Sequence, residues 1–227
     1  MKRQPIIILL ILFFVIPVSA STPADGAFGF VSTSVDKVLT ILRNPAFKEE
    51  STREIQRQKL RTVVEAFFNY NEISMRTLGR NRKSFTPVQM DEFSDLFTRL
   101  LEKIYLNRIR EYSDEKVIYG KATMLSENKA EVETTVVTAS KQIPINYRVV
   151  LKYGEWRGYD VIIEGVSLVR NYRSQFNKIL QKKTPEDLLQ QLREKVNKEK
   201  VTAKKAAVSK RNCITMGGKF CGKTAQL

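Results

Sequence analysis

Apolar residues recur at helical spacing through the N-terminal part of the chain. From Phe28 to Leu42, large apolar side chains fall every three or four positions until an Asn-Pro pair ends the pattern, which predicts an amphipathic helix. A second pattern of this kind begins near Thr52. A short third one ends at Gly79, because glycine suits the left-handed position that follows a helix. We therefore expect three helices before residue 80.

The strongest helical pattern is the segment 86–112, "TPVQMDEFSDLFTRLLEKIYLNRIREY". Thr86 can cap the helix, Pro87 suits its first position, and Gln89 completes a capping box with Thr86. At 1.5 Å per residue this helix spans about 39 Å, which is enough to cross a small domain. Its predicted buried face consists of Met90, Phe93, Phe97, Leu100, Leu101, Ile104 and Ile109.

The period then changes to two, which is typical of β-strands. Four strands are predicted, at Lys116–Leu125, Lys129–Thr138, Gln142–Tyr153 and Glu155–Glu164. The turns between them are short, so consecutive strands are expected to pair as antiparallel neighbours. On one face of this sheet the third strand places Ile145, Tyr147, Val149, Leu151 and Tyr153. One side of the sheet is therefore apolar and aromatic.

The stretch "DVIIEGVSLVRNYRSQF", residues 160–176, joins the last strand to a further helix through a glycine and a serine. Ser167 is predicted to cap that helix. Thr184 begins a final helix that carries Leu188, Leu189 and Leu192 on its buried side. The fold class is therefore α+β, with N-terminal helices, a four-stranded antiparallel curved sheet and C-terminal helices.

The first 20 residues are typical of a secretory signal peptide. Lys2 and Arg3 precede an apolar run of about 14 residues, and small residues follow it as far as Ala20. A retained membrane anchor is the alternative, but a spanning helix needs roughly 20 residues. We expect export with cleavage after Ala20, a mature domain at 21–195 and a tail at 196–227.

The net charge of +15 suggests a nucleic-acid-binding protein only until it is divided along the chain. The signal peptide carries two positive charges, and the tail carries eight basic residues against one acid, which leaves +6 for residues 21–195. An exported and moderately basic domain is not expected to bind nucleic acid. The tail has no sustained apolar period, so we expect it to be disordered.

Both cysteines, Cys213 and Cys221, lie in the tail. An oxidising compartment permits a disulfide between them, and two free thiols are an equal alternative. Two cysteines in a chain without histidine are too few for a zinc site, so no metal is expected.

The absence of histidine excludes nucleophilic and acid–base catalysis that depends on imidazole. Asp160 or Glu164 could act as a base in a buried pocket, but structural ion pairs with Arg170 and Arg173 are the favoured interpretation. Arg173 itself has two interpretations. It can bind a phosphate, or it can tie its helix to the sheet through Asp160 or Glu164, and the second is favoured.

Two segments resemble the MlaC-type auxiliary proteins of Gram-negative bacteria, also called toluene-tolerance transport auxiliary components. They are "RTLGRNRKSFTPVQMDEFSDLFTRLLEKIYLNRIREYS" and "IPINYRVVLKYGEWRGYDVIIEGVSLVRNYRSQFNKIL", and the resemblance extends over residues 31–195. It implies a periplasmic carrier of glycerophospholipid with no catalytic activity and no cofactor. The implied partners are an outer-membrane lipoprotein–porin complex and an inner-membrane ABC transporter with a mammalian-cell-entry-type subunit.

The resemblance also implies that the lipid is held by its acyl tails in a hydrophobic cavity between sheet and helices. Inward faces assigned by period then give the expected lipid-binding residues, which are Phe93, Phe97, Leu100, Leu101, Tyr105, Tyr147, Val149, Leu151, Tyr159, Val161 and Ile163. One alternative is a filled core in a structural envelope protein. The other is an enzyme that uses the same curved-sheet pocket, with a carboxylate base, on an apolar small molecule.

Overall fold

A computed structural model describes residues 22–110 and 115–197. Its helices are α1 (Pro23–Arg43), α2 (Arg53–Phe67), α3 (Tyr70–Leu78), α4 (Pro87–Arg110) and α5 (Leu168–Leu180), and a last helical segment spans residues 185–197. Short 3-10 helices are η1 (Pro45–Phe47), η2 (Glu50–Thr52) and η3 (Gly79–Ser84). The strands are β1 (Lys116–Ser126), β2 (Lys129–Val137), β3 (Gln142–Lys152), β4 (Glu155–Ile163) and β5 (Val166–Ser167).

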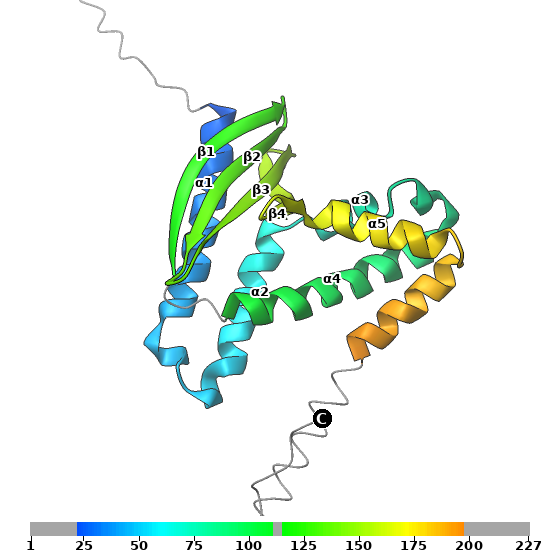
Figure 1. Ribbon diagram of the computed structural model, residues 1–227, viewed down its shortest axis with the longest axis horizontal. Helices are drawn as coiled ribbons and strands as arrows, with labels where there is room; N and C mark the ends of the chain where they lie inside the picture. Colours follow the sequence, from blue (N-terminus) through cyan, green and yellow to red (C-terminus); the bar gives the residue numbers. More distant parts are fainter. Residues whose placement is uncertain (1–21, 111–114, 198–227) are drawn as a thin grey trace, which may run out of the picture.

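The strands form one antiparallel sheet in the order β1-β2-β3-β4-β5. In Figure 1 α1 runs along this sheet, α4 crosses beneath it, and α5 leads away from it beside α3. The predicted α+β class is thus confirmed. The sheet differs from the prediction only in gaining the two-residue strand β5 at its edge.

The apolar face of the sheet packs against α1. Ala122, Val132, Tyr147 and Val161 are paired in succession across β1 to β4. Val31 of α1 is fully buried in the same cluster as Val132. Because strand side chains alternate between faces, the period of two in the sequence brings these apolar residues to one side.

The opposite face of the sheet is polar. Glu131 of β2 accepts a hydrogen bond from Nδ2 of Asn146 at 2.9 Å and another from Nε of Arg148 at 2.7 Å. These partners come from β3, so the two strands are linked by side chains as well as by their backbones. The sheet therefore has one apolar face that packs on α1 and one face of paired polar groups.

Two tight turns of the same kind end β3 and β4. Tyr153 and Gly154 have φ values of 51° and 80°, and Glu164 and Gly165 have 49° and 80°. Positive φ at both central positions is typical of the type I′ turns that join antiparallel strands. Tyr153 was predicted on the apolar face, and this is wrong: its side chain is fully exposed in the turn.

The edges of the sheet differ. Phe68 forms a parallel bridge with Gly158 of β4, and the N–H of Asn69 donates to the Gly158 carbonyl at 2.9 Å. This close approach requires glycine, because a Cβ at position 158 would lie 2.4 Å from a ring carbon of Phe67. The other edge of the sheet is β1. A β-bulge there places two residues of β1, Gly120 and Lys121, opposite a single residue of β2.

Residues at the helix termini behave as their sequence predicts. The N–H of Gln89 donates to Thr86 Oγ1 at 3.2 Å, and the N–H of Thr86 donates to Gln89 Oε1 at 3.1 Å, which confirms the capping box of α4. The last helix has the same arrangement between Thr184 and Asp187. These bonds fix where both helices begin.

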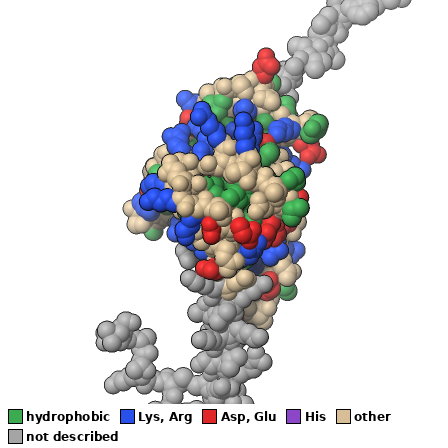
Figure 2. All heavy atoms as spheres, turned by 90° about the vertical axis from the view of Figure 1, so that its right-hand side faces the viewer, with side chains coloured by type: hydrophobic (Ala, Val, Ile, Leu, Met, Phe, Trp, Pro, Cys, Tyr) green, Lys and Arg blue, Asp and Glu red, His purple; other side chains and the backbone are tan. Residues whose placement is uncertain are grey.

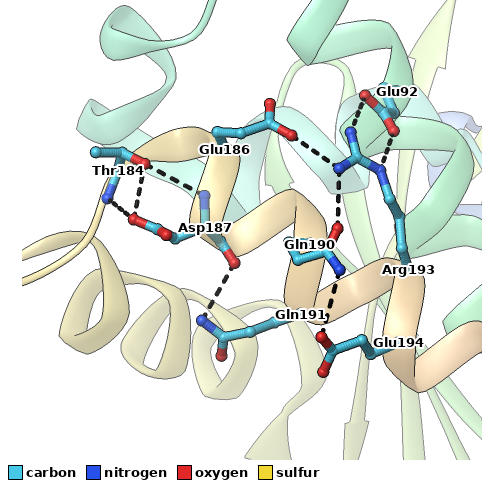
Figure 3. A network of polar contacts seen from close by, with 8 residues as sticks. All are labelled: Glu92, Thr184, Glu186, Asp187, Gln190, Gln191, Arg193 and Glu194. Carbon is cyan, nitrogen blue, oxygen red and sulfur yellow. Dashed lines mark hydrogen bonds and ion pairs between the residues drawn. The ribbon is translucent and has the colours of Figure 1, made fainter.

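The last helix is held against α4 by Arg193 (Figure 3). Its Nε and Nη2 donate to the two carboxylate oxygens of Glu92 at 2.7 and 2.9 Å, and its Nη1 donates to Glu186 at 2.8 Å. The geometry is the paired fork typical of arginine with a carboxylate. Leu188 and Leu192 are buried beneath it, as predicted from the sequence.

The core is divided into three clusters. The helical cluster joins α3, α4, α5 and the last helix, and its aromatic centre is formed by Phe93, Phe97 and Phe176. The sheet cluster joins α1, Phe67 and the apolar sheet face. A third cluster lies where α1, α2 and α4 meet. Phe68 packs against both the helical and the sheet cluster, so it links the two halves of the molecule.

Three predictions fall outside the described residues: the signal peptide, most of the tail, and the state of the tail's two cysteines. Within residues 22–110 and 115–197, no helix is both long enough and apolar enough to cross a bilayer.

Candidate functional site

Four of the predicted lipid-binding residues lie in the helical cluster. Phe93, Phe97, Leu100 and Leu101 all come from α4, and each is at most 6% exposed. Tyr105 lies one turn further along α4 and is half-buried against the same cluster. The structure therefore brings these five together, and the first four are enclosed by neighbouring side chains.

Five more of the predicted residues lie on the sheet. Tyr147 is paired directly with Val161 across β3 and β4. Both are half-buried, as are Leu151 and Ile163, whereas Val149 is fully buried in the sheet cluster. The apolar face is thus packed shut at Val149 and retains accessible apolar surface around Tyr147 and Val161.

Tyr159 is separate from both groups. β4 carries one extra residue between Gly158 and Asp160, and this bulge interrupts the strict alternation on which the prediction was based. The Tyr159 ring is buried, with the guanidinium carbon of Arg76 4.3 Å from its centroid. It therefore forms a cation–π contact with α3.

Tyr147 is the central residue of the accessible apolar surface. Its ring meets Phe67 edge-on at 5.6 Å between centroids, and Phe67 in turn stacks on Phe30 of α1 at 5.0 Å. Burial raises the pKa of Tyr147 to about 12, although the side chain keeps accessible surface. Because Tyr147 keeps accessible surface, its ring is available to contact a ligand at this position.

Phe30 was not among the predicted residues. It falls between the regularly spaced apolar positions of α1, so the helical period gave no reason to choose it. Its stacking on Phe67 depends on the tertiary packing of α1 against α2. A signal was present only in the unusual density of phenylalanine at residues 28–30 and 67–68.

A tyrosine pair lies at the helical side of the site. Tyr105 and Tyr172 interact electrostatically with each other, and burial raises the pKa of both, that of Tyr172 to about 12. The Tyr172 ring also packs edge-on against Phe97 at 4.9 Å. The pair gives this apolar region one polar point that remains neutral over the physiological pH range.

The carboxylate of Asp160 is a structural group. Its oxygens accept hydrogen bonds from Ser167 Oγ at 2.6 Å, the N–H of Val169 at 3.0 Å and the N–H of Val161 at 2.9 Å. Ser167 Oγ in turn accepts from the N–H at position 170, which confirms it as the cap of α5. With both oxygens engaged, Asp160 is poorly placed to act as a base.

The predicted ion-pair partners of Asp160 were wrong. Nη1 of Arg148 lies 3.9 Å from the Asp160 carboxylate, whereas Nε of Arg173 donates to the carbonyl oxygen of Arg76 at 2.7 Å. The cation beside Asp160 therefore comes from the neighbouring strand β3, because Arg148 is paired with Asp160 in the sheet register. Arg173 projects toward α3 instead of tying α5 to the sheet.

Comparison with known proteins decides the family. The family model described as MlaC protein matches residues 32–194, which include every predicted lipid-binding residue. The chain belongs to the MlaC family.

Similar proteins agree with this assignment. A toluene tolerance protein from Pseudomonas putida is 26% identical over 183 residues, covering 79% of this chain and 83% of that protein. The intermembrane phospholipid transport system binding protein MlaC of Haemophilus influenzae is 26% identical over 144 residues, covering 60% and 67% of the two chains.

A solved structure shares the fold of this MlaC-family chain. It is a phospholipid-binding protein from Ralstonia solanacearum, in complex with a phospholipid. The TM-score is 0.68 at 23% sequence identity, and the match covers 76% of this chain and 97% of the other. The family is one of phospholipid-binding and transport proteins.

The described parts of this MlaC-family chain contain no group of three or more acidic, cysteine or histidine side chains arranged to hold a metal ion. The accessible apolar surface around Tyr147 and Val161 is the candidate functional site.

Proposed function

We propose that this chain is a periplasmic carrier that holds a glycerophospholipid by its acyl chains and shuttles it between the two membranes. The observation that carries the proposal is the half-buried apolar surface around Tyr147 and Val161, in a chain of the MlaC family. Tyr147 packs against the sheet cluster, and its ring contact with Phe67 continues to Phe68, which alone among the described residues adjoins both the sheet and the helical cluster. Acyl chains that enter there can reach both the sheet and the helical half.

Transfer energetics explain why such a protein needs no chemistry. Each methylene moved from an apolar medium into water costs about 0.8 kcal/mol, so a lipid with roughly 30 of them does not cross an aqueous space alone. A carrier must only cover the acyl chains. The full engagement of Asp160 in the α5 cap agrees with a function that has no catalytic step and no cofactor.

The proposed partners of the carrier are two membrane complexes, one in the outer and one in the inner membrane. An outer-membrane lipoprotein–porin complex and an inner-membrane ABC transporter with a mammalian-cell-entry-type subunit would exchange lipid with the carrier. The proposal includes export by the N-terminal segment, with cleavage after Ala20. The Haemophilus influenzae relative is named for an intermembrane phospholipid transport system, which supports this placement.

Within the proposed site, the eleven predicted residues have unequal roles. The half-buried residues Tyr105, Tyr147, Leu151, Val161 and Ile163 supply the contact surface. The fully enclosed side chains of α4 and Val149 form the wall behind it. Phe30 and Phe68 extend the contact surface beyond the predicted set.

The direct test is native mass spectrometry of protein that is exported in cells and purified without detergent. We expect a population with the added mass of one or more phospholipids, identified by extraction and fragmentation. If repeated preparations carry no lipid and phospholipid vesicles fail to load the protein, the chain is not a lipid carrier.

Two valines on the same sheet face provide a matched pair of variants. Val161→Trp adds volume where the side chain is half-buried, so it should reduce lipid occupancy at least about twofold with little change in thermal midpoint. Val149→Trp adds the same volume where the side chain is 0% exposed. Overpacking there should lower the free energy of unfolding by about 1–3 kcal/mol.

Lipid occupancy is measured by native mass spectrometry and stability by urea denaturation, for both variants and the parent. If Val161→Trp unfolds the protein as Val149→Trp does, and its folded fraction still carries full lipid, the region around Tyr147 is a filled core.

A further inference from the structure

A hollow lies on the helical half of the molecule, and it is distinct from the apolar surface around Tyr147. It has a volume of about 810 Å³ and is formed by the end of α3, by η3 and by the middle of α5. We refer to it as the basic pocket, because its charged lining residues are Arg76, Arg80, Arg82, Lys83 and Arg173 with the single carboxylate Glu72. None of the eleven predicted lipid-binding residues lines it.

The single carboxylate of the basic pocket is already neutralised. Glu72 Oε1 lies 2.7 Å from Nη2 of Arg76, and its Oε2 lies 2.6 Å from Nζ of Lys152. No carboxylate among the described residues is in ion-pair contact with Arg80, Arg82, Lys83 or Arg173. Four cations therefore surround one hollow without an acidic partner, and the pocket has a strongly positive potential.

These cations are partly fixed in place. Gly79 ends α3 with a φ of 56° and turns the chain into η3, so that the stem of Arg173 packs over it with Cδ 3.6 Å from the position of an added Cβ. The bond from Nε of Arg173 to the Arg76 carbonyl anchors the guanidinium. Its Nη1 and Nη2 make no hydrogen bond within the described part of the chain, so they are available to a ligand.

The two sides of the pocket are also joined. Nδ2 of Asn81 in η3 donates to Oδ1 of Asn177 in α5 at 3.2 Å. Figure 2 looks onto the side of the molecule where these elements end. Lys and Arg side chains gather over its upper and left part, with a group of Asp and Glu side chains below them and a few more at the top and right margins. The positive charge is thus concentrated on one part of this face.

We propose that the basic pocket binds a phosphate group. A guanidinium fork matches the oxygens of phosphate, and arginine forms its strongest hydrogen bonds with such anions. Because the site is a hollow, a compact anion can enter it, whereas a flat acidic surface would contact only its rim. The phosphate can belong to a free phosphate compound or to the headgroup of a lipid, because both present the same oxygens to Arg82 and Arg173.

The proposal is independent of acyl-chain binding. The pocket is linked to the predicted lipid-binding residues through the contact of Arg76 with Tyr159 and through Leu78, which belongs to the helical cluster. A chain that carried no lipid would still present the same four unpaired cations. Failure of the carrier proposal and failure of this one are therefore distinguishable.

The test is isothermal titration calorimetry of the mature chain at low ionic strength with two soluble probes. Inorganic phosphate represents the free anion, and dihexanoylphosphatidic acid below its micelle concentration represents the lipid headgroup. We expect saturable binding with one site. The double variant Arg80→Ser, Arg82→Ser removes two exposed side chains that make no ion pair or side-chain hydrogen bond within the described residues, and it should weaken binding by roughly tenfold, as the loss of charge-assisted hydrogen bonds would.

A matched control removes the same charge outside the pocket. Arg170 and Lys178 are exposed on α5 and do not line the hollow. Arg170→Ser, Lys178→Ser should keep the affinity within about twofold, because exposed charges that do not line the hollow act on the bound anion only through solvent. Arg173→Lys keeps the charge but removes the fork, and it should also weaken binding. Circular dichroism of each variant verifies that the fold is intact.

The outcomes separate the sources of the phosphate. Binding of both probes with equal sensitivity to the Arg80, Arg82 variant supports a site for the phosphate group itself. Binding of phosphatidic acid alone, with the same sensitivity, supports a headgroup site. The proposal is overturned if neither probe binds, if the control variant weakens binding as much as the pocket variant, or if only anionic vesicles bind.

Discussion

Glu102 of α4 is a buried charged residue that lacks a full set of hydrogen-bond partners. Its side chain is 7% exposed, and its Oε1 is the one buried side-chain polar atom of the described residues that lacks a hydrogen-bond partner. Nε of Arg61 lies 3.3 Å from the other oxygen. Burial raises the pKa of Glu102, and the nearby carboxylate of Glu65 acts in the same direction, against the attraction of Arg61.

The raised pKa has a definite consequence for stability. The folded state binds the Glu102 proton more tightly than the unfolded state does. Stability from this group is therefore fully present below the ordinary glutamate pKa and is lost as the pH rises through the raised pKa. Above that raised pKa, the ionised and incompletely paired carboxylate destabilises the fold.

We predict that Glu102→Gln stabilises the protein at pH 7 by on the order of 1 kcal/mol, since it removes a poorly satisfied buried charge. The gain should vanish below about pH 4, where Glu102 is itself neutral. Urea denaturation between pH 4 and pH 7 measures this. Glu65→Gln, at an exposed partner of Arg61, is the control and should change stability by no more than about 0.5 kcal/mol. A gain from Glu102→Gln that is independent of pH would show that ionisation is not its cause.

At the scale of the elements, the junction from β4 to α5 is a compact hydrogen-bonded unit. Asp160 on the strand accepts from Ser167 and from the first turn of α5, so one carboxylate positions the helix against the sheet. The end of β4 pairs with β5 immediately before the helix. The orientation of α5, and with it the placement of Tyr172 and Arg173, depends on this unit.

We predict that Asp160→Asn lowers the free energy of unfolding by about 1–3 kcal/mol, because an amide nitrogen would face hydrogen-bond donors that then lack an acceptor. Glu164→Gln, four residues away in the exposed turn, is the matched control and should change it by less than about 0.5 kcal/mol. Urea denaturation of both variants gives the comparison. An equal response would mean that the α5 cap does not depend on the Asp160 carboxylate.

The structural features that could be predicted from the sequence are those formed by residues close together in the chain. The Thr86 and Gln89 capping box and the Ser167 cap each join groups only three residues apart, so their sequence spacing determines them. Tyr153 could not be placed correctly by alternation, because the turn begins at the residue before Gly154 and the apolar tyrosine concealed it.

The parts that could not be predicted depend on contacts distant in sequence. The sequence around Gly158 does not indicate that the Phe67 ring lies against this glycine. Nor does it indicate the bulge next to Gly158, which separates Tyr159 from Tyr147. Arg173 meets a backbone carbonyl 97 residues away. A period identifies which residues turn inward, but it does not show which inward-facing residues are packed shut and which remain accessible.

At the scale of the whole molecule, the basic tail is the remaining source of positive charge. Nζ of Lys103 donates to the carbonyl of Lys195 at 2.6 Å, and Val196 packs against the helical cluster. The folded unit therefore continues to residue 197, and a truncation that tests the tail should be made after it. Residues 198–227 contain eight basic side chains and one acid.

We predict that deletion of 198–227 leaves lipid occupancy and thermal midpoint nearly unchanged and reduces association with anionic vesicles. Each Lys or Arg near such a surface contributes about 1 kcal/mol, and salt screens the attraction. Vesicle co-sedimentation at low and high salt measures the effect, with zwitterionic vesicles as the control. If the truncated chain loses its lipid or its fold, the tail is part of the domain.

The two edges of the sheet determine how copies of the protein behave when they are crowded together. An open strand edge can pair with the same edge of another molecule and begin an aggregate. Here β4 is closed by β5 and by Phe68, and the free edge β1 carries a bulge at Gly120 and Lys121. A bent, lysine-bearing strand is a poor template for a neighbour. The protein can therefore keep the accessible apolar surface around Tyr147 and still resist polymerisation through its sheet.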